Sequence, residues 1–355
     1  MKPKFHRLKM KTLKSLDLKG KRVLVRCDFN VPLDPKGNIL HDFRIQQMLP
    51  TIEYLMKEGA KIILMSHLGR PEGKIVEELR LTPIQDRLTE YLNVSLSKAA
   101  DCLGLEVEKW IGEMKPGEIL LLENLRFHKE EEQNDDNFAR ELAKLGDIFV
   151  NDAFGASHRS HASIVGVPKY LPSAAGLLLE KEIRVLTDLM ENTRKPLLAI
   201  MGGAKVETKA RLINKISKIA DFVLIGGLID RELREKKILL DYPSKVIPPL
   251  DDIEGKDIGP KTIELFREKI SLAKTVFFNG VLGMVEVEKY AKGTEEILKA
   301  VAGSKALSIL GGGDMTQVIT RLGLENKFNH ISTGGGAMLE FLAGEKLPGL
   351  EALSR

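Results

Sequence analysis

Charged and polar side chains follow several short apolar runs in the first half of the sequence, either directly or after a few residues. In chain order they are Asp28 and Asn30, His67 and Arg70, Arg126, and Arg159. If the runs are parallel strands, these side chains meet at one edge of a sheet, where α/β proteins bind ligands. Guanidinium groups pair bidentately with carboxylate and phosphate, and Asp28 and Asn30 can bind hydroxyl groups. One such arginine alone is more often a surface residue, but their recurrence predicts a cup for a small polyanion.

In the second half of the sequence, glycines follow the apolar runs instead. They are Gly202-Gly203, Gly226-Gly227, Asn279-Gly280, Gly311-Gly312-Gly313 and Gly334-Gly335-Gly336. Such turns let backbone N–H groups approach a phosphate and open helices whose first turn favours anions. Asp314 follows one turn and Lys205 another, which together predict a nucleotide phosphate site with a carboxylate for Mg²⁺. Neither G-x-G-x-x-G nor the P-loop motif occurs, so dinucleotide oxidoreductases and P-loop NTPases are disfavoured.

The elements that must hold these residues alternate between two patterns. Short β-branched or Leu-rich runs are followed by polar or glycine residues and then by segments of helical period, such as 43–57 and 136–144. This alternation predicts an α/β fold with parallel sheets and right-handed crossovers. The runs include 22–25, 61–65, 118–122, 147–150, 197–201, 221–225, 275–278 and 306–310.

Two domains are expected from the length and from the contrast between the strand ends. A chain of 355 residues with 43% hydrophobic content is large enough for two cores. The helical stretch at about 178–192 is the predicted connector. An arginine cup facing a glycine cradle suits phosphoryl transfer between a small acid and a nucleotide, because that reaction depends on positioning and charge neutralisation.

Composition excludes several other classes of protein. Lys+Arg 54 nearly balance Asp+Glu 50, and the net charge of +4 gives no reason to expect a nucleic-acid partner. No apolar run approaches the roughly 18 residues of a membrane span, so no membrane partner is expected. Cys27 and Cys102 lie too far apart in sequence for a disulfide framework or a zinc site, which fits a reducing cytoplasm. The basic segment 1–22 is Lys-rich rather than Ser- and Arg-rich, so we interpret it as a solvated arm and not a transit peptide.

Two weaker signals favour structural interpretations. His158 and His161 have metal-ligand spacing, but no cysteine or carboxylate lies close beside them in the sequence, so a metal site is disfavoured. Cys27 follows an apolar run and is expected to be a buried thiol rather than a nucleophile.

Long motifs in the sequence resemble those of the phosphoglycerate kinase family over nearly the whole chain. They occur in family order: KRVLVRCDFNVP (21–32), MSHLGRP (65–71), LLLENLRFHKEE (120–131), VNDAFGASHRSH (150–161), GGAKVETK (202–209), DIGPKTIELF (257–266), FNG (278–280), GGGD (311–314) and HISTGGGAMLEFL (330–342).

The resemblance implies two Rossmann-like lobes with parallel sheets joined by a helix. Residues 1–173, with the tail 345–355, would bind 3-phosphoglycerate, and residues 174–344 would bind Mg-nucleotide. The implied reaction is the reversible glycolytic transfer of a phosphoryl group from 1,3-bisphosphoglycerate to ADP, with Mg²⁺ as cofactor. The implied enzyme is a cytoplasmic monomer whose only partners are these small molecules.

Site residues are carried over from the motifs one by one. Arg44, Lys205 and Lys209 would be catalytic, and Asp314 would bind the metal. The residues implied to bind the acid are Asp28, Phe29, Asn30, Arg44, His67, Leu68, Gly69, Arg70, Arg126 and Arg159. Those implied to bind the nucleotide are Gly203, Lys209, Gly226, Gly227, Asn279, Glu286, Gly312, Gly313, Asp314 and Met315.

Departures from the family pattern all fall on the nucleotide side. A segment that in the family forms part of the wall over the adenine is missing between Leu228 and Asp257. The other departures are Leu228 for a third glycine, Val281 for proline, Phe278 for tryptophan, Met315 for serine or threonine, and Thr208 for an acid. We therefore expect a working kinase with poor adenine discrimination. The alternative is a non-catalytic 3-phosphoglycerate-binding protein descended from the kinase, with a degenerate nucleotide site. An oxidoreductase on a similar double lobe is rejected because the sequence has no dinucleotide fingerprint.

Overall fold

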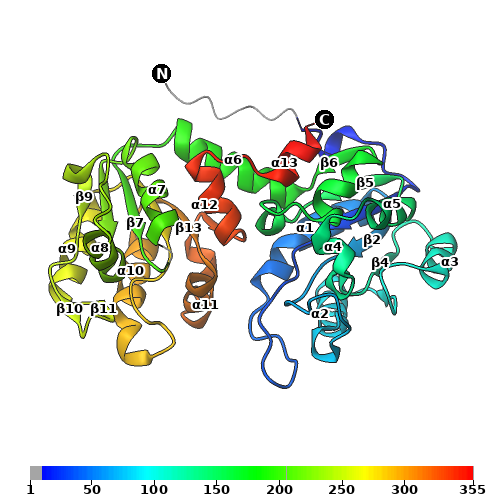
Figure 1. Ribbon diagram of the computed structural model, residues 1–355, viewed down its shortest axis with the longest axis horizontal. Helices are drawn as coiled ribbons and strands as arrows, with labels where there is room; N and C mark the ends of the chain where they lie inside the picture. Colours follow the sequence, from blue (N-terminus) through cyan, green and yellow to red (C-terminus); the bar gives the residue numbers. More distant parts are fainter. Residues whose placement is uncertain (1–9, 205, 355) are drawn as a thin grey trace. The chain divides into compact units, whose positions relative to one another are not determined.

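The computed structural model describes residues 10–204 and 206–354. This part of the chain divides into two compact units. The N-terminal unit contains residues up to 183 together with those from 346 onward, and the C-terminal unit contains residues 184–345. Figure 1 shows strands flanked by helices in each unit.

A six-stranded parallel sheet forms the centre of the N-terminal unit, in the order β3-β4-β2-β1-β5-β6. Chain order reverses between β1 and β5, which pair directly. Ligands of open α/β sheets bind at such a reversal, beyond the carboxyl ends of the strands. The strands are β1 (Arg22–Arg26), β2 (Lys61–Met65), β3 (Ser97–Lys98), β4 (Ile119–Leu121), β5 (Ile148–Asn151) and β6 (Ser173–Ala175).

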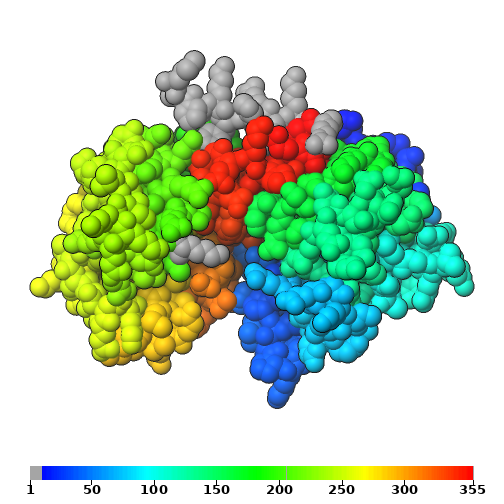
Figure 2. All heavy atoms as spheres, viewed as in Figure 1, coloured from blue at the N-terminus to red at the C-terminus, as the bar shows by residue number. Residues whose placement is uncertain are grey.

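Helices cover this sheet through apolar stripes. On α1 the residues Ile45, Met48, Ile52 and Leu55 are spaced by three and four positions and are all fully buried in the core. The loop 27–42 between β1 and α1 runs outward and ends in the blue projection at the bottom of Figure 2. The helices are α1 (Phe43–Lys57), α2 (Thr82–Leu92), α3 (Leu105–Glu113), α4 (Lys129–Gln133), α5 (Asp136–Lys144) and the C-terminal α13 (Pro348–Leu353).

The C-terminal segment belongs to the N-terminal unit. The backbone N–H of Gly349, in α13, donates to the carbonyl oxygen of Ser157 at 2.9 Å. A Cβ atom at Gly349 would lie 2.9 Å from a methyl carbon of Ile164 and 3.0 Å from the backbone of Ser157. Helix α13 therefore packs closely against the loop that carries Arg159.

The C-terminal unit has a second six-stranded parallel sheet, in the order β9-β8-β7-β12-β13-β14. Because β7 is its first strand and β12 its fourth, this is the order of a doubly wound nucleotide-binding fold, with the reversal between β7 and β12. The strands are β7 (Leu197–Met201), β8 (Phe222–Ile225), β9 (Val246–Ile247), β12 (Thr275–Asn279), β13 (Leu307–Gly311) and β14 (His330–Ser332).

Two groups of helices pack in this unit: α7 contacts α8 and α12, and α9 contacts α10. A two-stranded antiparallel hairpin, β10 (Asp252–Ile253) with β11 (Asp257–Ile258), precedes α9. The helices are α6 (Leu177–Glu191), which crosses the boundary between the units, α7 (Val206–Ser217), α8 (Gly227–Glu235), α9 (Pro260–Leu272), α10 (Lys292–Gly303), α11 (Gly313–Arg321) and α12 (Gly335–Ala343).

The predicted α/β fold with two parallel sheets is confirmed. The helices predicted at 43–57 and 136–144 are observed as α1 and α5 with the same bounds. Among the described residues, no helix combines the length and the apolar composition that crossing a bilayer requires.

Candidate functional site

Three elements of the N-terminal unit are tied together around Arg44, in the first turn of α1. Its Nη1 donates to the carbonyl oxygen of Asn30 at 2.9 Å and lies 3.3 Å from the Asp28 carboxylate. The side-chain oxygen of Asn30 accepts a hydrogen bond from the N–H of Gly69 at 2.9 Å. The loops after β1 and β2 and the start of α1 therefore meet at one point.

Arg126 is a buried arginine of this site with an incomplete set of hydrogen bonds. It lies in the 3₁₀ turn η3 (Leu125–Phe127) after β4 and is only 2% exposed. Its Nη1 donates to the carbonyl oxygen of Gly69 at 2.8 Å, and its Nε lies 3.2 Å from Glu132. Its Nη2 has no hydrogen-bond partner in the part of the chain that the structure describes. Burial and the charge of Arg159 lower the pKa of Arg126 to about 10.

A bound anion would supply the acceptor that Nη2 of Arg126 lacks. A buried donor without an acceptor costs roughly 1–3 kcal/mol, and more when it is charged. Gly69, whose carbonyl oxygen accepts from Arg126, has φ +64°, and a Cβ atom there would lie 2.7 Å from the Leu79 side chain, so this turn favours glycine. The unpartnered Nη2 of Arg126 thus identifies a position for a phosphate or carboxylate oxygen.

Beneath this cup lies an arginine that the sequence-based list lacks. Arg26 is fully buried at the end of β1, and its Nη2 lies 3.2 Å from Nδ1 of His67. Its Nε donates to the hydroxyl of Ser163 at 2.8 Å, and that hydroxyl donates to Glu131 at 2.6 Å. The available sequence signal was a charged residue directly after the apolar run of residues 23–25.

Burial and the surrounding arginines lower the pKa values of the two histidines in the cup. Burial and then the charges of Arg26, Arg126, Arg159 and Arg44 hold the pKa of His67 well below its usual value. Burial together with Arg126, Arg26 and Arg159 lowers the pKa of His161 to about 3. A site whose cations depress one another's proton affinity is suited to an anion.

The remaining predicted acid-site residues occupy two kinds of position. Phe29 and Leu68 are buried, and their backbone N–H groups donate to Ser66 and Asn124 at 2.9 Å and 3.3 Å. They therefore shape the loops rather than present side chains. Arg159 is partly buried and Arg70 is exposed.

In the C-terminal unit, the ends of β7 and β12 approach each other at glycines. The N–H of Gly202 donates to Asn279 O at 2.8 Å, and the N–H of Gly203 donates to Val281 O at 2.6 Å. A Cβ atom at Gly202 would lie 2.2 Å from the Val281 carbonyl oxygen, which no side chain could tolerate. Only glycine permits this contact between the two strand ends at the sheet reversal.

Lys209, on α7, lies beside this point and is 5% exposed. Its ammonium group donates to the side-chain oxygen of Asn279, whose amide donates to Gly311 O at 3.0 Å. Burial lowers the pKa of Lys209 to about 7. The predicted residues Lys209 and Asn279 are therefore in direct contact.

The other predicted nucleotide residues lie at helix starts and on a loop. Gly226 and Gly227 begin α8, while Glu286 is exposed on the loop after β12. Gly312 has φ +125°, which lets the chain turn into α11. Asp314 is exposed in the first turn of α11, whereas Met315 is fully buried. Lys205 lies outside the described residues.

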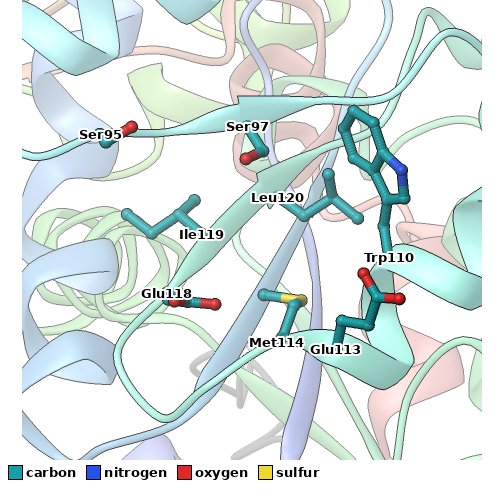
Figure 3. Close-up of a pocket in the computed structure, with 8 residues that line it drawn as sticks. All are labelled: Ser95, Ser97, Trp110, Glu113, Met114, Glu118, Ile119 and Leu120. Carbon is teal, nitrogen blue, oxygen red and sulfur yellow. The ribbon is translucent and has the colours of Figure 1, made fainter.

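A pocket of about 330 Å³ lies at the opposite edge of the N-terminal sheet. It is lined by Ser95, Ser97, Trp110, Glu113, Met114, Glu118, Ile119 and Leu120. Figure 3 shows Trp110 and Glu113 extending from α3 beside the amino ends of β3 and β4. It is therefore separate from the cup at the carboxyl ends.

Comparison with known proteins gives one consistent result. The profile of the phosphoglycerate kinase family matches residues 13–238 and 235–345. A phosphoglycerate kinase from Dictyoglomus turgidum is 47% identical, covering 96% of this chain and 97% of the relative. One from Aquifex aeolicus is 44% identical, covering 96% and 97%. The crystal structure of phosphoglycerate kinase from Pyrococcus horikoshii OT3 has a TM-score of 0.86 at 34% identity and covers 97% of this chain and 98% of that one.

The match to the family profile is divided into two segments. Its two matched segments meet at residues 235–238, just after α8. The alignment with the Dictyoglomus turgidum relative runs over 388 positions, although this chain has 355 residues. A break in the match at this place agrees with the expected missing segment between Leu228 and Asp257.

Proposed function

The chain belongs to the phosphoglycerate kinase family, and we propose that its two units carry out the reaction of that family. A phosphoryl group passes from the acyl phosphate of 1,3-bisphosphoglycerate to ADP, giving 3-phosphoglycerate and ATP. In the reverse direction the carboxylate of 3-phosphoglycerate is the acceptor. The step belongs to glycolysis, and the protein is a phosphotransferase.

The observation that carries the acid half of the proposal is the buried guanidinium of Arg126 with its unpartnered Nη2. A phosphate or carboxylate oxygen completes its hydrogen bonding, and Arg159 adds a second charge close by. Asp28 and Asn30 provide acceptors for the hydroxyl of the acid. The proposed acid site comprises Asp28, Phe29, Asn30, Arg44, His67, Leu68, Gly69, Arg70, Arg126 and Arg159.

On the acid side, Arg44 is the proposed catalytic residue. Its Nη1 is held by Asn30 O and the Asp28 carboxylate, so the guanidinium is oriented before substrate arrives. Charge on the phosphoryl oxygens is stabilised best by donors that need no reorganisation. Lys209 serves the same purpose from the nucleotide side, and the role of Lys205 is carried by the family resemblance alone.

The nucleotide half of the proposal is supported by the glycine turns of the C-terminal unit. Gly203, Gly226, Gly227, Gly312 and Gly313 lie at strand ends and helix starts of a doubly wound sheet. Asn279, Glu286 and Asp314 complete the proposed set, whereas Met315 is fully buried in α11 and is assigned to the core.

Asp314 fits Mg²⁺, because its carboxylate is exposed and hard oxygen ligands are those that this ion prefers. When bound, the ion supplies positive charge to the phosphate oxygens. Asp314, in the first turn of α11, would hold it.

We propose that the N-terminal unit, with residues up to 183 and from 346 onward, is the acid domain and that residues 184–345 are the nucleotide domain. We further propose that the protein acts as a monomer in the cytoplasm, without nucleic-acid or membrane partners. The two cysteines, Cys27 and Cys102, are free and buried, which suits a reducing compartment.

The test is a coupled assay of the purified full chain with 3-phosphoglycerate and Mg-ATP, together with calorimetry of each ligand. We expect turnover that requires both substrates, and separate binding of each. Binding of 3-phosphoglycerate without Mg-nucleotide binding or turnover would instead establish the non-catalytic alternative.

A further inference from the structure

Three side chains of metal-binding type gather at the carboxyl edge of the N-terminal sheet. Asp101 and Cys102 lie on the loop after β3, and His128 follows the turn after β4. One ligand atom from each lies within 4.8 Å of the other two. The sequence argued against zinc because Cys27 and Cys102 are far apart, but these three residues come together only through the pairing of β3 with β4.

The three groups are held in place before any ion arrives. His128 Nε2 lies 2.7 Å from Oδ1 of Asp101, and the same oxygen accepts from the N–H of Cys102 at 2.6 Å. The His128 ring packs on Phe138 with ring centres 5.4 Å apart. Preorganised ligands lose little conformational entropy on binding an ion.

Access and charge also suit a cation. The Asp101 and His128 side chains are 52% and 30% exposed, so an ion can enter from solvent, while Cys102 forms the buried floor. The charges of Glu130 and Glu131 act on His128 and Cys102 respectively. Lys98, the last residue of β3, is paired with Glu123 at 2.8 Å. The local field is therefore not dominated by an unpaired lysine.

We propose that Asp101, Cys102 and His128 form a site for a divalent cation of the zinc class. Thiolate, imidazole and carboxylate are the ligands that Zn²⁺ takes in tetrahedral sites, with water in the fourth position when the protein offers three. On coordination the Cys102 thiol releases its proton to solvent, and His128 gives up the Nε2 proton that points at Asp101, either to solvent or by taking the Nδ1–H tautomer, so that Nε2 can bind the metal.

The place of the site gives it a structural consequence. His128 is two residues from Arg126, and Cys102 lies on a different strand's loop. A bound ion therefore ties the loop after β3 to the turn that carries the acid-binding arginine. Metal binding does not require the kinase activity, so its test is independent of the assay above.

Co²⁺ is the probe of choice, because a thiolate ligand gives it a charge-transfer band in the near ultraviolet. The reduced full chain in phosphate-free buffer is titrated with CoCl₂, and then ZnCl₂ is added. We expect one cobalt per chain in a thiolate-coordinated form, loss of the band on adding Zn²⁺, and a higher Tm with Zn²⁺. Absence of the thiolate band would overturn the proposal and leave the cluster as an ion pair.

Variants separate this site from other cation sites on the chain. Cys102→Ser should abolish the band, and Asp101→Asn, at an exposed position, should weaken binding about tenfold or more without depending on the core. Cys27→Ser is the matched control, a second buried cysteine outside the cluster, and should keep the band. A band that survives Cys102→Ser, or that Cys27→Ser removes, would also overturn the assignment.

Discussion

The ammonium group of Lys209 donates a hydrogen bond to the side-chain oxygen of Asn279, and both residues are almost fully buried in the C-terminal unit. Asn279 also donates to Gly311 O at 3.0 Å, so one amide links the ends of β12 and β13 to α7. Because no acid faces it in this contact, burial dominates and the pKa of Lys209 falls to about 7. The lysine is therefore poised to gain a proton when an anion arrives.

This contact predicts that nucleotide binding takes up a proton. Nucleotide phosphates favour the charged ammonium and raise the pKa of Lys209 from about 7 in the free protein. At pH 8 binding must then be accompanied by proton uptake, and affinity falls as the pH rises above 7. At pH 6 the lysine is already charged and uptake is small. Calorimetry in two buffers of different ionisation enthalpy measures the uptake.

Lys209→Met supplies the control for that experiment, because it removes the titrating group while keeping an unbranched side chain. Proton uptake at pH 8 should disappear in this variant. Equal uptake in both proteins would assign the linkage to another group.

Arg44→Ala should lower kcat by about 10²-fold or more, by analogy with the loss of an oxyanion-hole donor. The guanidinium is oriented by Asn30 O and Asp28, so its removal takes away a preorganised charge. Arg140→Ala is the matched control: the same change, in the same unit, at an exposed residue paired with Asp136. Steady-state kinetics with saturating substrates measure both, and full activity of Arg44→Ala would remove that residue from the mechanism.

The central strands were predictable because they are buried on both faces and read as continuous apolar runs. All eight predicted runs are strands, each within one residue of the expected bounds. The predicted runs did not include β3, β6, β9 and β14, which have only two or three residues. So short a segment carries no periodicity to distinguish it from a loop.

Much of the cup was also predictable, because arginines at strand ends are visible in the sequence. Arg26 was missed because the predicted run ended at residue 25, whereas β1 extends to Arg26. The cluster of Asp101, Cys102 and His128 was missed for a different reason. Its members come together through the parallel pairing of β3 with β4, and β3 had no signal of its own.

Asp152→Asn should stabilise the protein increasingly as the pH rises from 4 to 7. Burial raises the pKa of this fully buried carboxyl to about 7, against roughly 3.9 in an unfolded chain. Below pH 4 both states are protonated, so the group has no effect. Between 4 and 7 folding takes up a proton, and stability falls with pH until it levels off above 7. Urea unfolding at pH 5 and pH 8 should show the advantage of the variant growing by roughly 1–3 kcal/mol.

Asp147→Asn should change the pH dependence of stability in the opposite direction. Its hydrogen bonds with Arg22 lower the pKa of the Asp147 carboxyl, so its stabilising contribution is present at neutral pH and lost on acidification. This variant should be less stable than the parent at pH 8 and should approach it in acid. If the stability difference from the parent changed with pH in the same direction for both variants, at least one of the two pKa directions would be wrong.

Met315→Thr should cost stability, because the Met315 side chain is fully buried in α11. Shortening a buried methionine leaves a cavity and typically costs about 2–4 kcal/mol. Met315→Leu keeps the volume and should cost less than about 1.5 kcal/mol. Thermal unfolding measures both variants. If Met315→Thr is neutral in stability and tightens nucleotide binding, residue 315 contacts nucleotide instead of filling the core.

The shortened stretch after α8 leads to a prediction about nucleotide preference. In the described part of the C-terminal unit, Leu228 directly after Gly227 and Met284 and Val287 on the loop after β12 are exposed. The family match breaks at 235–238, where the wall over the adenine is expected to be missing. A base held only by apolar contact is discriminated weakly, whereas hydrogen bonds to its edge give factors of 10⁴ or more.

We therefore expect kcat/KM for ADP to exceed that for GDP by less than about 10²-fold. The difference should lie in KM rather than kcat, because Arg44 and Lys209 act on the phosphates and not on the base. The kinase of Dictyoglomus turgidum, 47% identical over 388 aligned positions, is the matched comparison in the same coupled assay. If this chain prefers ADP as strongly as that relative does and binds it as tightly, the segment after α8 does not contribute to base selection.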